Sequence, residues 1–208
     1  QLTLFNNPER LERCLARAWD ASPLTLIITE GLEASRENHH ESALVSVLVE
    51  AMRGARSDLS PQEDERFWRD ELFVIGPHNM QNDLTRQTLT QSRAWGAKPF
   101  VQTVDKAQGQ EARSVIISYG VSDLEFILSE MEFIYDLNRL NVSITRAKEK
   151  VILLLSRALL DGDLSVLDNP KALAGLSYMR HVEARCRARA EGERFELSEG
   201  VSLELLSL

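Results

Sequence analysis

Short apolar segments alternate with amphipathic ones along most of the chain, and this alternation constrains the fold more than any other feature. The apolar segments are typical of strands buried on both faces, and they are residues 24–29, 72–76, 100–104, 114–119 and 150–155. Between them, apolar residues recur at helical spacing, in residues 8–19, 38–54, 80–96 and 137–148. Strands that alternate with helices predict a parallel sheet covered on both faces. The sequence therefore predicts an α/β fold with a mostly parallel sheet of about five strands.

The end of the chain has a different character. A longer apolar stripe from Leu173 to Cys186 predicts one helix, and residues 194–206 predict a β-hairpin that turns at Glu199-Gly200. We therefore expect a helical lead-in, an α/β domain, and a C-terminal appendage of helix and hairpin. These three parts are residues 1–23, 24–160 and 161–208.

Composition limits the class of protein. The 208 residues include 24 Lys and Arg against 32 Asp and Glu, and 43% of all residues are hydrophobic. That apolar fraction excludes a disordered chain, and the net charge of −8 excludes a basic nucleic-acid coat protein. Any nucleic-acid binding must therefore be local.

The sequence also indicates a compartment. No apolar run approaches the roughly 20 residues that a membrane span needs, so no membrane contact is expected. Cys14 and Cys186 have no metal-type spacing, and reduced thiols in a cytoplasmic protein are the favoured interpretation, with a disulfide as the alternative.

Polar residues that follow the strands are the candidates for function, because ligands of open parallel α/β sheets bind beyond the carboxyl ends of strands. They are Pro77, His78, Asn79, Gln81, Asp105, Lys106, Gln108, Gly109, Gln110, Glu111, Arg139, Asn141, Thr145, Arg146 and Lys148. The chain has no G-x-x-x-x-G-K-[ST] sequence to cradle nucleotide phosphates, and no strand ends in an acidic pair for magnesium. The chain alone is therefore not expected to hydrolyse a nucleotide.

Two stretches among these candidates resemble helicase motifs. Residues 101–111 read VQTVDKAQGQE, and residues 139–148 read RLNVSITRAK. Together they are similar to motifs V and VI of superfamily-one helicases, in the up-frameshift-type branch, which reads TVD-x-x-QG-x-E and then RLNV-x-x-TRA. Residues 73–81, FVIGPHNMQ, are similar to motif IV of that branch, and residues 35–43 to a segment that precedes it. The resemblance covers roughly residues 24–157.

The resemblance implies a RecA-like three-layer fold and the second, C-terminal motor domain of an ATP-dependent helicase that moves 5′ to 3′. ATP and Mg²⁺ would lie in a cleft shared with a preceding RecA-like domain. Arg146 matches the arginine that reaches across that cleft to the γ-phosphate, and a permanently charged planar guanidinium suits this role. Glu111 matches the acid that hydrogen-bonds the ribose, and Gln108 and Gly109 belong to the same nucleotide-binding motif.

Three further residues match positions that hold single-stranded DNA or RNA by its backbone. They are Thr103, Pro77 and His78. The branch usually has Tyr where His78 stands and often Arg where Gln110 stands. Its Tyr-Arg-Met motif is not in residues 1–23, so either the chain begins inside the second domain or that part of the nucleotide site has been lost.

Several of these residues have plainer explanations. Arg146 could be a solvated helix arginine or pair with Asp136, and Glu111 could be an acid favoured by a helix N-terminus. Asn38 and Glu41 form a capping box in the sequence. No metal site is expected, since His39 and its neighbour His40 point in different directions on a helix.

Two alternatives stay open at larger scale. The basic residues of the C-terminal helix could form a solvated face or a nucleic-acid patch, and they are Arg180, Arg185, Arg187 and Arg189. The alternative function is a non-enzymatic interaction module, derived from a helicase, that docks a partner through its acidic surface and hairpin.

Overall fold

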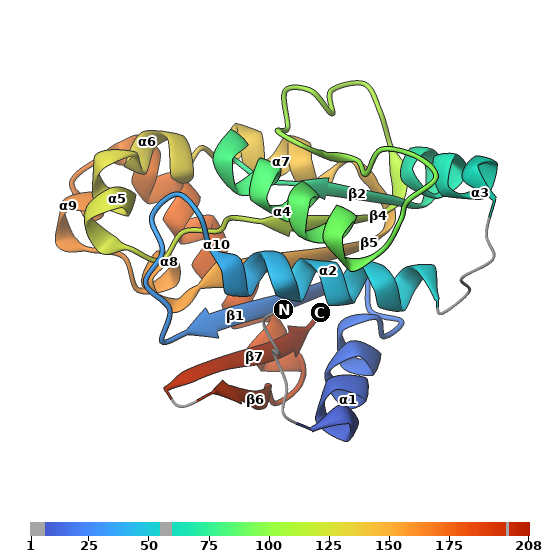
Figure 1. Ribbon diagram of the computed structural model, residues 1–208. Coiled ribbons are helices and arrows are strands. Elements are labelled where there is room, and N and C mark those ends of the chain that lie inside the picture. Colours follow the sequence, from blue (N-terminus) through green and yellow to red (C-terminus); the bar gives the residue numbers. More distant parts are fainter. Residues whose placement is uncertain (1–6, 55–59, 199) are drawn as a thin grey trace.

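One sheet runs through the computed structural model, which describes residues 7–54, 60–198 and 200–208 (Figure 1). Its seven strands are β1 (Leu24–Glu30), β2 (Leu72–Ile75), β3 (Val101–Gln102), β4 (Ala112–Ser118), β5 (Ala147–Ser156), β6 (Glu193–Ser198) and β7 (Val201–Ser207). The order across the sheet is β3-β2-β4-β5-β1-β7-β6. The first five of these strands pair in parallel, and β7 pairs antiparallel with β1 and β6. The predicted α/β class is therefore confirmed, and the C-terminal hairpin continues the same sheet.

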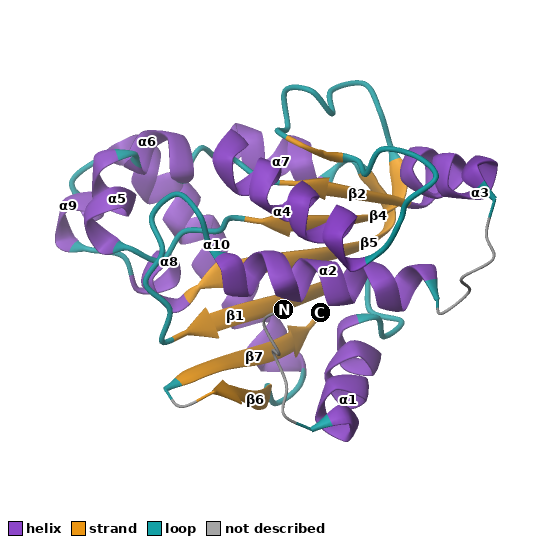
Figure 2. Cartoon of the chain, viewed as in Figure 1, coloured by secondary structure: helices purple, strands orange, loops and turns teal. Residues whose placement is uncertain are grey.

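Helices cover both faces of the sheet and make a three-layer structure (Figure 2). On one face lie α1 (Pro8–Ala18), α2 (His39–Arg53), the π-helical turn η1 (Phe67–Glu71) and α4 (Asn79–Ser92), with α3 (Pro61–Arg66) preceding η1. On the other face lie α7 (Leu137–Ile144), α8 (Arg157–Asp161) and α10 (Pro170–Arg189). Beyond the carboxyl ends of the strands lie α5 (Leu124–Ser129), α6 (Met131–Ile134) and α9 (Leu164–Leu167).

Alternation along the strands produces the two apolar cores, because successive strand residues point to opposite faces. On β1, Leu26 and Ile28 join the core under α7 and α10, whereas Ile27 joins the core under α2. All three side chains are buried. Fully buried strands explain why the sequence shows continuous apolar runs rather than a polar and apolar alternation.

Side-chain caps begin several of the helices. The Asn7 side chain accepts the backbone N–H of Glu9 at 2.8 Å, and Pro8 follows in the first turn of α1. Asn169 caps α10 in the same way, with Pro170 next. The predicted helix at residues 8–19 is thereby confirmed within one residue.

The segment 55–70 was predicted to be a surface connection, and this is wrong for its described part, residues 60–70. Ser60 and Glu63 form a reciprocal capping box at the start of α3. Asp64 is buried and pairs with Arg53 of α2 at 2.7 Å. Trp68 is also buried, and its ring lies 4.9 Å from that of Trp95. Residues 55–59 lie outside the described residues.

Other element boundaries differ from the sequence prediction. The helix predicted for 137–148 ends at Ile144, because Ala147 already pairs with Ala112 as a strand residue. The strand predicted for 100–104 is reduced to β3, and α5 and α6 form where only an acidic loop was expected. Of the predicted turn residues Glu199-Gly200, only Gly200 lies among the described residues.

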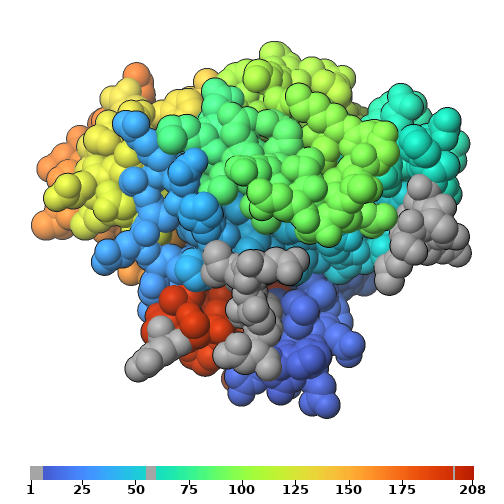
Figure 3. Space-filling view, in the orientation of Figure 1, coloured from blue at the N-terminus to red at the C-terminus, as the bar shows by residue number. Residues whose placement is uncertain are grey.

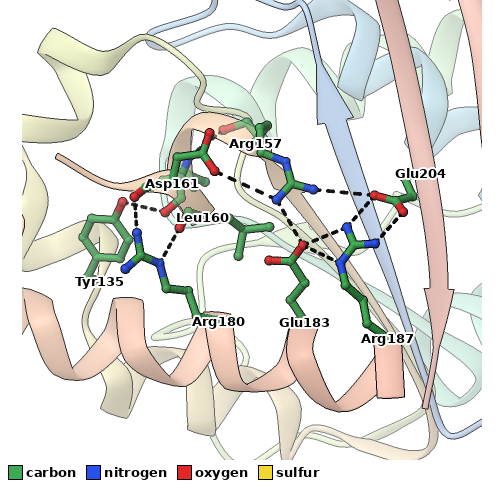
Figure 4. Close-up of polar contacts among 10 residues, drawn as sticks. Tyr135, Arg157, Leu160, Asp161, Arg180, Glu183, Arg187 and Glu204 are labelled. Carbon is green, nitrogen blue, oxygen red and sulfur yellow. Dashed lines mark hydrogen bonds and ion pairs between the residues drawn. The ribbon is translucent and has the colours of Figure 1, made fainter. Parts of the chain in front are cut away.

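An ion-pair network ties α10 to the sheet (Figure 4). Glu183 on α10 contacts Arg157 of α8 at 3.0 Å and Arg187 of its own helix at 2.9 Å. Both arginines also contact Glu204 of β7, at 3.5 and 2.7 Å. Arg180 donates to the carbonyls of Leu160 and Asp161 at the end of α8. Two of the four helix arginines, Arg180 and Arg187, therefore serve internal packing rather than a free basic patch.

Among the described helices, none has the length and apolar composition required to cross a membrane.

Candidate functional site

The predicted site residues form two groups at opposite edges of the sheet. Pro77 comes two residues after β2 and Thr103 directly after β3, at the carboxyl edge, where the N–H of Gly76 donates to the carbonyl of Gln102 at 3.1 Å. Glu111 and Arg146 directly precede the parallel strands β4 and β5, at the amino edge. The expectation that Glu111 and Arg146 lie beyond the carboxyl ends of strands is therefore wrong, because the loop 103–111 crosses from one edge to the other and Arg146 directly precedes β5.

Arg146 is held by backbone atoms at the amino edge. Its guanidinium donates to the carbonyl of Val142 at 3.0 Å and to that of Gln110 at 3.2 Å, and its own carbonyl accepts the N–H of Ala112 at 2.9 Å. In residues 7–54, 60–198 and 200–208 it has no carboxylate partner within ion-pair distance. The side chain is partly exposed. A third guanidinium N–H donates to the Thr145 hydroxyl at 3.3 Å. The side chain is thus an oriented cation whose other N–H groups have no partner in the described part of the chain and can bind an anion.

Both plainer explanations of Arg146 are wrong. Since α7 ends at Ile144, Arg146 lies in the connection between helix and strand rather than on a helix face. Asp136 has another task, because its side chain caps α7 by accepting the N–H groups of Asn138 and Arg139. A guanidinium that no acid neutralises is available to a phosphate.

The turn before β4 presents the predicted nucleotide-binding residues to solvent. Gln108, Gly109 and Glu111 are exposed. Gly109 has φ +78°, a left-handed conformation that glycine adopts without strain. The Gln110 N–H donates to the carbonyl of Ala107 at 3.1 Å, which closes the turn. Glu111 follows this turn and precedes a strand, so its explanation as a helix-terminal acid is also wrong.

At the carboxyl edge, Thr103 is buried and His78 lies against two aromatic rings. The His78 ring centroid lies 5.4 Å from that of Phe126 and 5.1 Å from that of Phe133. Burial lowers the pKa of His78, while Glu130 nearby opposes this shift. His78 is therefore neutral near pH 7 and contributes an aromatic ring rather than a charge.

Glu41 lies buried in the first turn of α2, and its sequence context indicates only a role in capping that helix. The Asn38 side chain does accept the Glu41 N–H at 2.9 Å. The Glu41 carboxylate, however, accepts the Ser118 hydroxyl at 2.6 Å and the Gly120 N–H at 2.8 Å, both just at or beyond the end of β4. The prediction of a capping box is therefore wrong for its second hydrogen bond, because the Asn38 N–H donates to Gln81 and not to the Glu41 side chain. Burial raises the pKa of Glu41 to about 7.

Gln81 extends this contact to the first turn of α4. Its side-chain oxygen accepts the Asn38 N–H at 2.7 Å, and its side-chain nitrogen donates to the Ser42 hydroxyl at 3.0 Å. The start of α2, the first turn of α4 and the end of β4 are thus tied together by buried polar groups. The motif pattern included Gln81 among the candidates. Its hydrogen-bond partners could not be predicted, because they lie about forty residues away in the sequence.

The residues of the described part of the chain include no group of three His, Cys, Asp or Glu side chains that could hold a metal ion.

Comparison with known proteins identifies the family. A family model described as an AAA domain matches residues 19–158, which include both groups of site residues. The chain therefore belongs to this AAA-domain family. Its curated relatives are named as DNA-binding proteins and helicases, and with the family match they make the chain a superfamily-one helicase domain of the up-frameshift type.

Three of these relatives show the extent of the similarity. The DNA-binding protein SMUBP-2 of Rattus norvegicus is 30% identical over 138 residues, which are 62% of this chain and 12% of that protein. The DNA replication ATP-dependent helicase/nuclease DNA2 of Bos taurus is 37% identical over 84 residues, 40% of this chain and 8% of that protein. The DNA polymerase alpha-associated DNA helicase A of Schizosaccharomyces pombe is 31% identical over 114 residues, 55% of this chain and 15% of that protein. The chain thus matches only a small part of each relative's length.

Proposed function

We propose that this chain is the second RecA-like domain of an ATP-dependent helicase or translocase that acts on single-stranded nucleic acid. The observation that carries the proposal is Arg146, a guanidinium held at the amino edge by two carbonyls and free of any acidic partner among the described residues. Its neighbours Gln108, Gly109 and Glu111 are exposed on the adjoining turn. This arrangement suits a nucleotide that approaches the amino edge from a second domain.

At the nucleotide, Arg146 stabilises the charge that develops on the γ-phosphate during transfer. The Glu111 carboxylate accepts a hydrogen bond from a ribose hydroxyl, and Gly109 allows the turn to approach without a side chain in the way. ATP and Mg²⁺ are held mainly by a preceding domain with a phosphate-binding loop, because this chain has no such sequence. The chain alone therefore hydrolyses no ATP.

At the opposite edge, Thr103, Pro77 and His78 hold part of a single strand by its backbone. The loop from Thr103 to Glu111 supports a link between the two activities, because this one segment runs from the strand-binding edge to the nucleotide-binding edge. A movement of Glu111 and Arg146 on the nucleotide is thereby transmitted to the hold on the strand. The net charge of −8 is compatible with such a track, because only local groups grip the strand.

Binding of the isolated chain to single strands tests the strand-holding role. We expect weak binding of labelled single-stranded DNA and RNA by fluorescence anisotropy, with no ATP hydrolysis. Thr103→Val removes the hydroxyl at nearly constant volume and should weaken both affinities about tenfold, since a hydrogen bond to a charged phosphate is lost. Thr90→Val, on an exposed position of α4, is the matched control and should bind as the wild type does. Unchanged binding by Thr103→Val would contradict the assignment of this residue to the strand.

A further inference from the structure

A hollow of about 280 Å³ opens at the carboxyl edge, on the side of His78. Its walls come from three places in the sequence: the loop after β1, the start of α4, and helices α5 and α6. Figure 3 shows these segments in contact, with the blue loop after β1 between the green start of α4 and the yellow α5–α6 region. The volume is close to the lower end of the range for small-ligand sites, about 300 Å³.

One wall of the hollow is aromatic. His78 contacts both Phe126 and Phe133, and all three rings line the hollow and are only partly buried, so apolar ring surface remains accessible there. Met80, also on the wall, is 46% exposed. Aromatic and thioether side chains that stay exposed together at a hollow suit a flat, polarisable ligand.

The charges at the rim point to the orientation of that ligand. The Arg36 guanidinium lies over the Phe126 ring at 5.8 Å and makes no ion pair in the described residues. Glu130 also lines the hollow and is exposed, and its negative charge disfavours a phosphate inside. A flat uncharged group inside the hollow avoids repulsion by Glu130. An anionic group of the same ligand, outside the hollow, can pair with Arg36.

We propose that the hollow receives one unstacked nucleobase of the bound single strand, with the adjoining phosphate against Arg36. This inference rests on the proposed strand-binding function and adds a contact to bases, whereas Thr103 and Pro77 are expected to contact only the backbone. Stacking on Phe126 and Phe133 gives affinity without reading sequence, because every base has a π-face. The hollow lies at the edge opposite to Arg146, so it is separate from the nucleotide site.

Abasic strands provide the test. The chain is titrated with labelled single-stranded DNA and with a strand of the same length that carries abasic sites throughout. The wild type should bind the base-bearing strand about tenfold more tightly. Phe126→Leu keeps an apolar side chain of similar size but removes the ring, and it should lose most of this preference while binding to the abasic strand stays nearly unchanged.

Two further variants complete the design. Leu124→Ala removes an exposed leucine from the same helix, outside the hollow, and should bind as the wild type does. Arg36→Gln, in an exposed loop where folding is not at risk, should weaken binding of both strands alike. Equal affinity of the wild type for both strands would overturn the base pocket and leave the proposed function standing. Failure to bind either strand would overturn both.

Discussion

Glu41 shows how one residue can gain a role that its sequence context hides. Asn38 and Glu41 have the spacing of a capping box, and half of that box is present. The carboxylate turns away because Ser118 and Gly120, at the end of β4, offer two donors in the interior. These donors are 77 and 79 residues away in sequence, so no local sequence pattern could predict them.

The buried Glu41 carboxyl makes stability depend on pH. Its pKa is raised by burial from 4.5 to about 7, so the folded state holds a proton that the unfolded state releases between these pH values. The free energy of unfolding should therefore fall as pH rises from 4.5 to 7, by roughly 3 kcal/mol. Glu41→Gln cannot ionise and should lack this contribution.

Urea denaturation at a series of pH values measures the effect. The stability of Glu41→Gln relative to the wild type should increase between pH 4.5 and 7 and then level off. Glu37→Gln, at an exposed position just before α2, should follow the wild type at every pH. A difference between Glu41→Gln and the wild type that does not change with pH would contradict the buried, shifted carboxyl.

At the scale of elements, the sequence predicted what local physics determines. Caps such as Asn7 and continuous apolar runs such as residues 24–29 located helices and buried strands correctly. Elements that depend on distant contacts were missed. The segment around Trp68 folds because Trp68 packs on Trp95 and Asp64 pairs with Arg53, and the end of α7 is set by strand pairing of Ala147.

Gly175 on α10 tests a close approach between elements. A Cβ atom there would lie 1.8 Å from the carbonyl oxygen of Tyr135, in the connection from α6 to α7. Gly175→Ala should lower Tm by roughly 5 °C, because the overlap outweighs the gain of about 1 kcal/mol in helix propensity. Ser177→Ala, exposed on the same helix, should leave Tm unchanged or slightly raised. A thermal melt of Gly175→Ala at or above the wild-type Tm would show that α10 does not pack this closely.

At the scale of the whole molecule, one sheet carries both edges of the proposed motor, and the hairpin β6–β7 continues it beyond β1. The network of Arg157, Glu183, Arg187 and Glu204 fastens α8, α10 and β7 together (Figure 4). The C-terminal helix is therefore built into one of the layers that cover the sheet, and the hairpin into the sheet itself.

The motifs in the sequence were sufficient to indicate the helicase family, but not the layout of its site. The motif sequences around Thr103, Glu111 and Arg146 indicated these residues as candidates. The general rule that ligands bind beyond the carboxyl ends of parallel strands, however, placed all three at the same edge of the sheet. The crossing of the loop 103–111 becomes visible only when β3 and β4 are aligned in parallel. Likewise, Phe126 meets His78 through tertiary packing between distant segments, which no spacing in the sequence reveals.

ATP turnover by a protein in which a phosphate-binding-loop domain precedes this chain measures whether Arg146 completes the nucleotide site. We expect turnover stimulated by single-stranded nucleic acid, and a loss of about 1,000-fold in kcat for Arg146→Ala, because the transition-state charge loses its guanidinium. Arg146→Lys should recover only part of the loss, since it keeps the charge but not the planar fork, and strand affinity should not change in either variant. Wild-type turnover in Arg146→Ala would show that Arg146 does not stabilise the γ-phosphate during transfer.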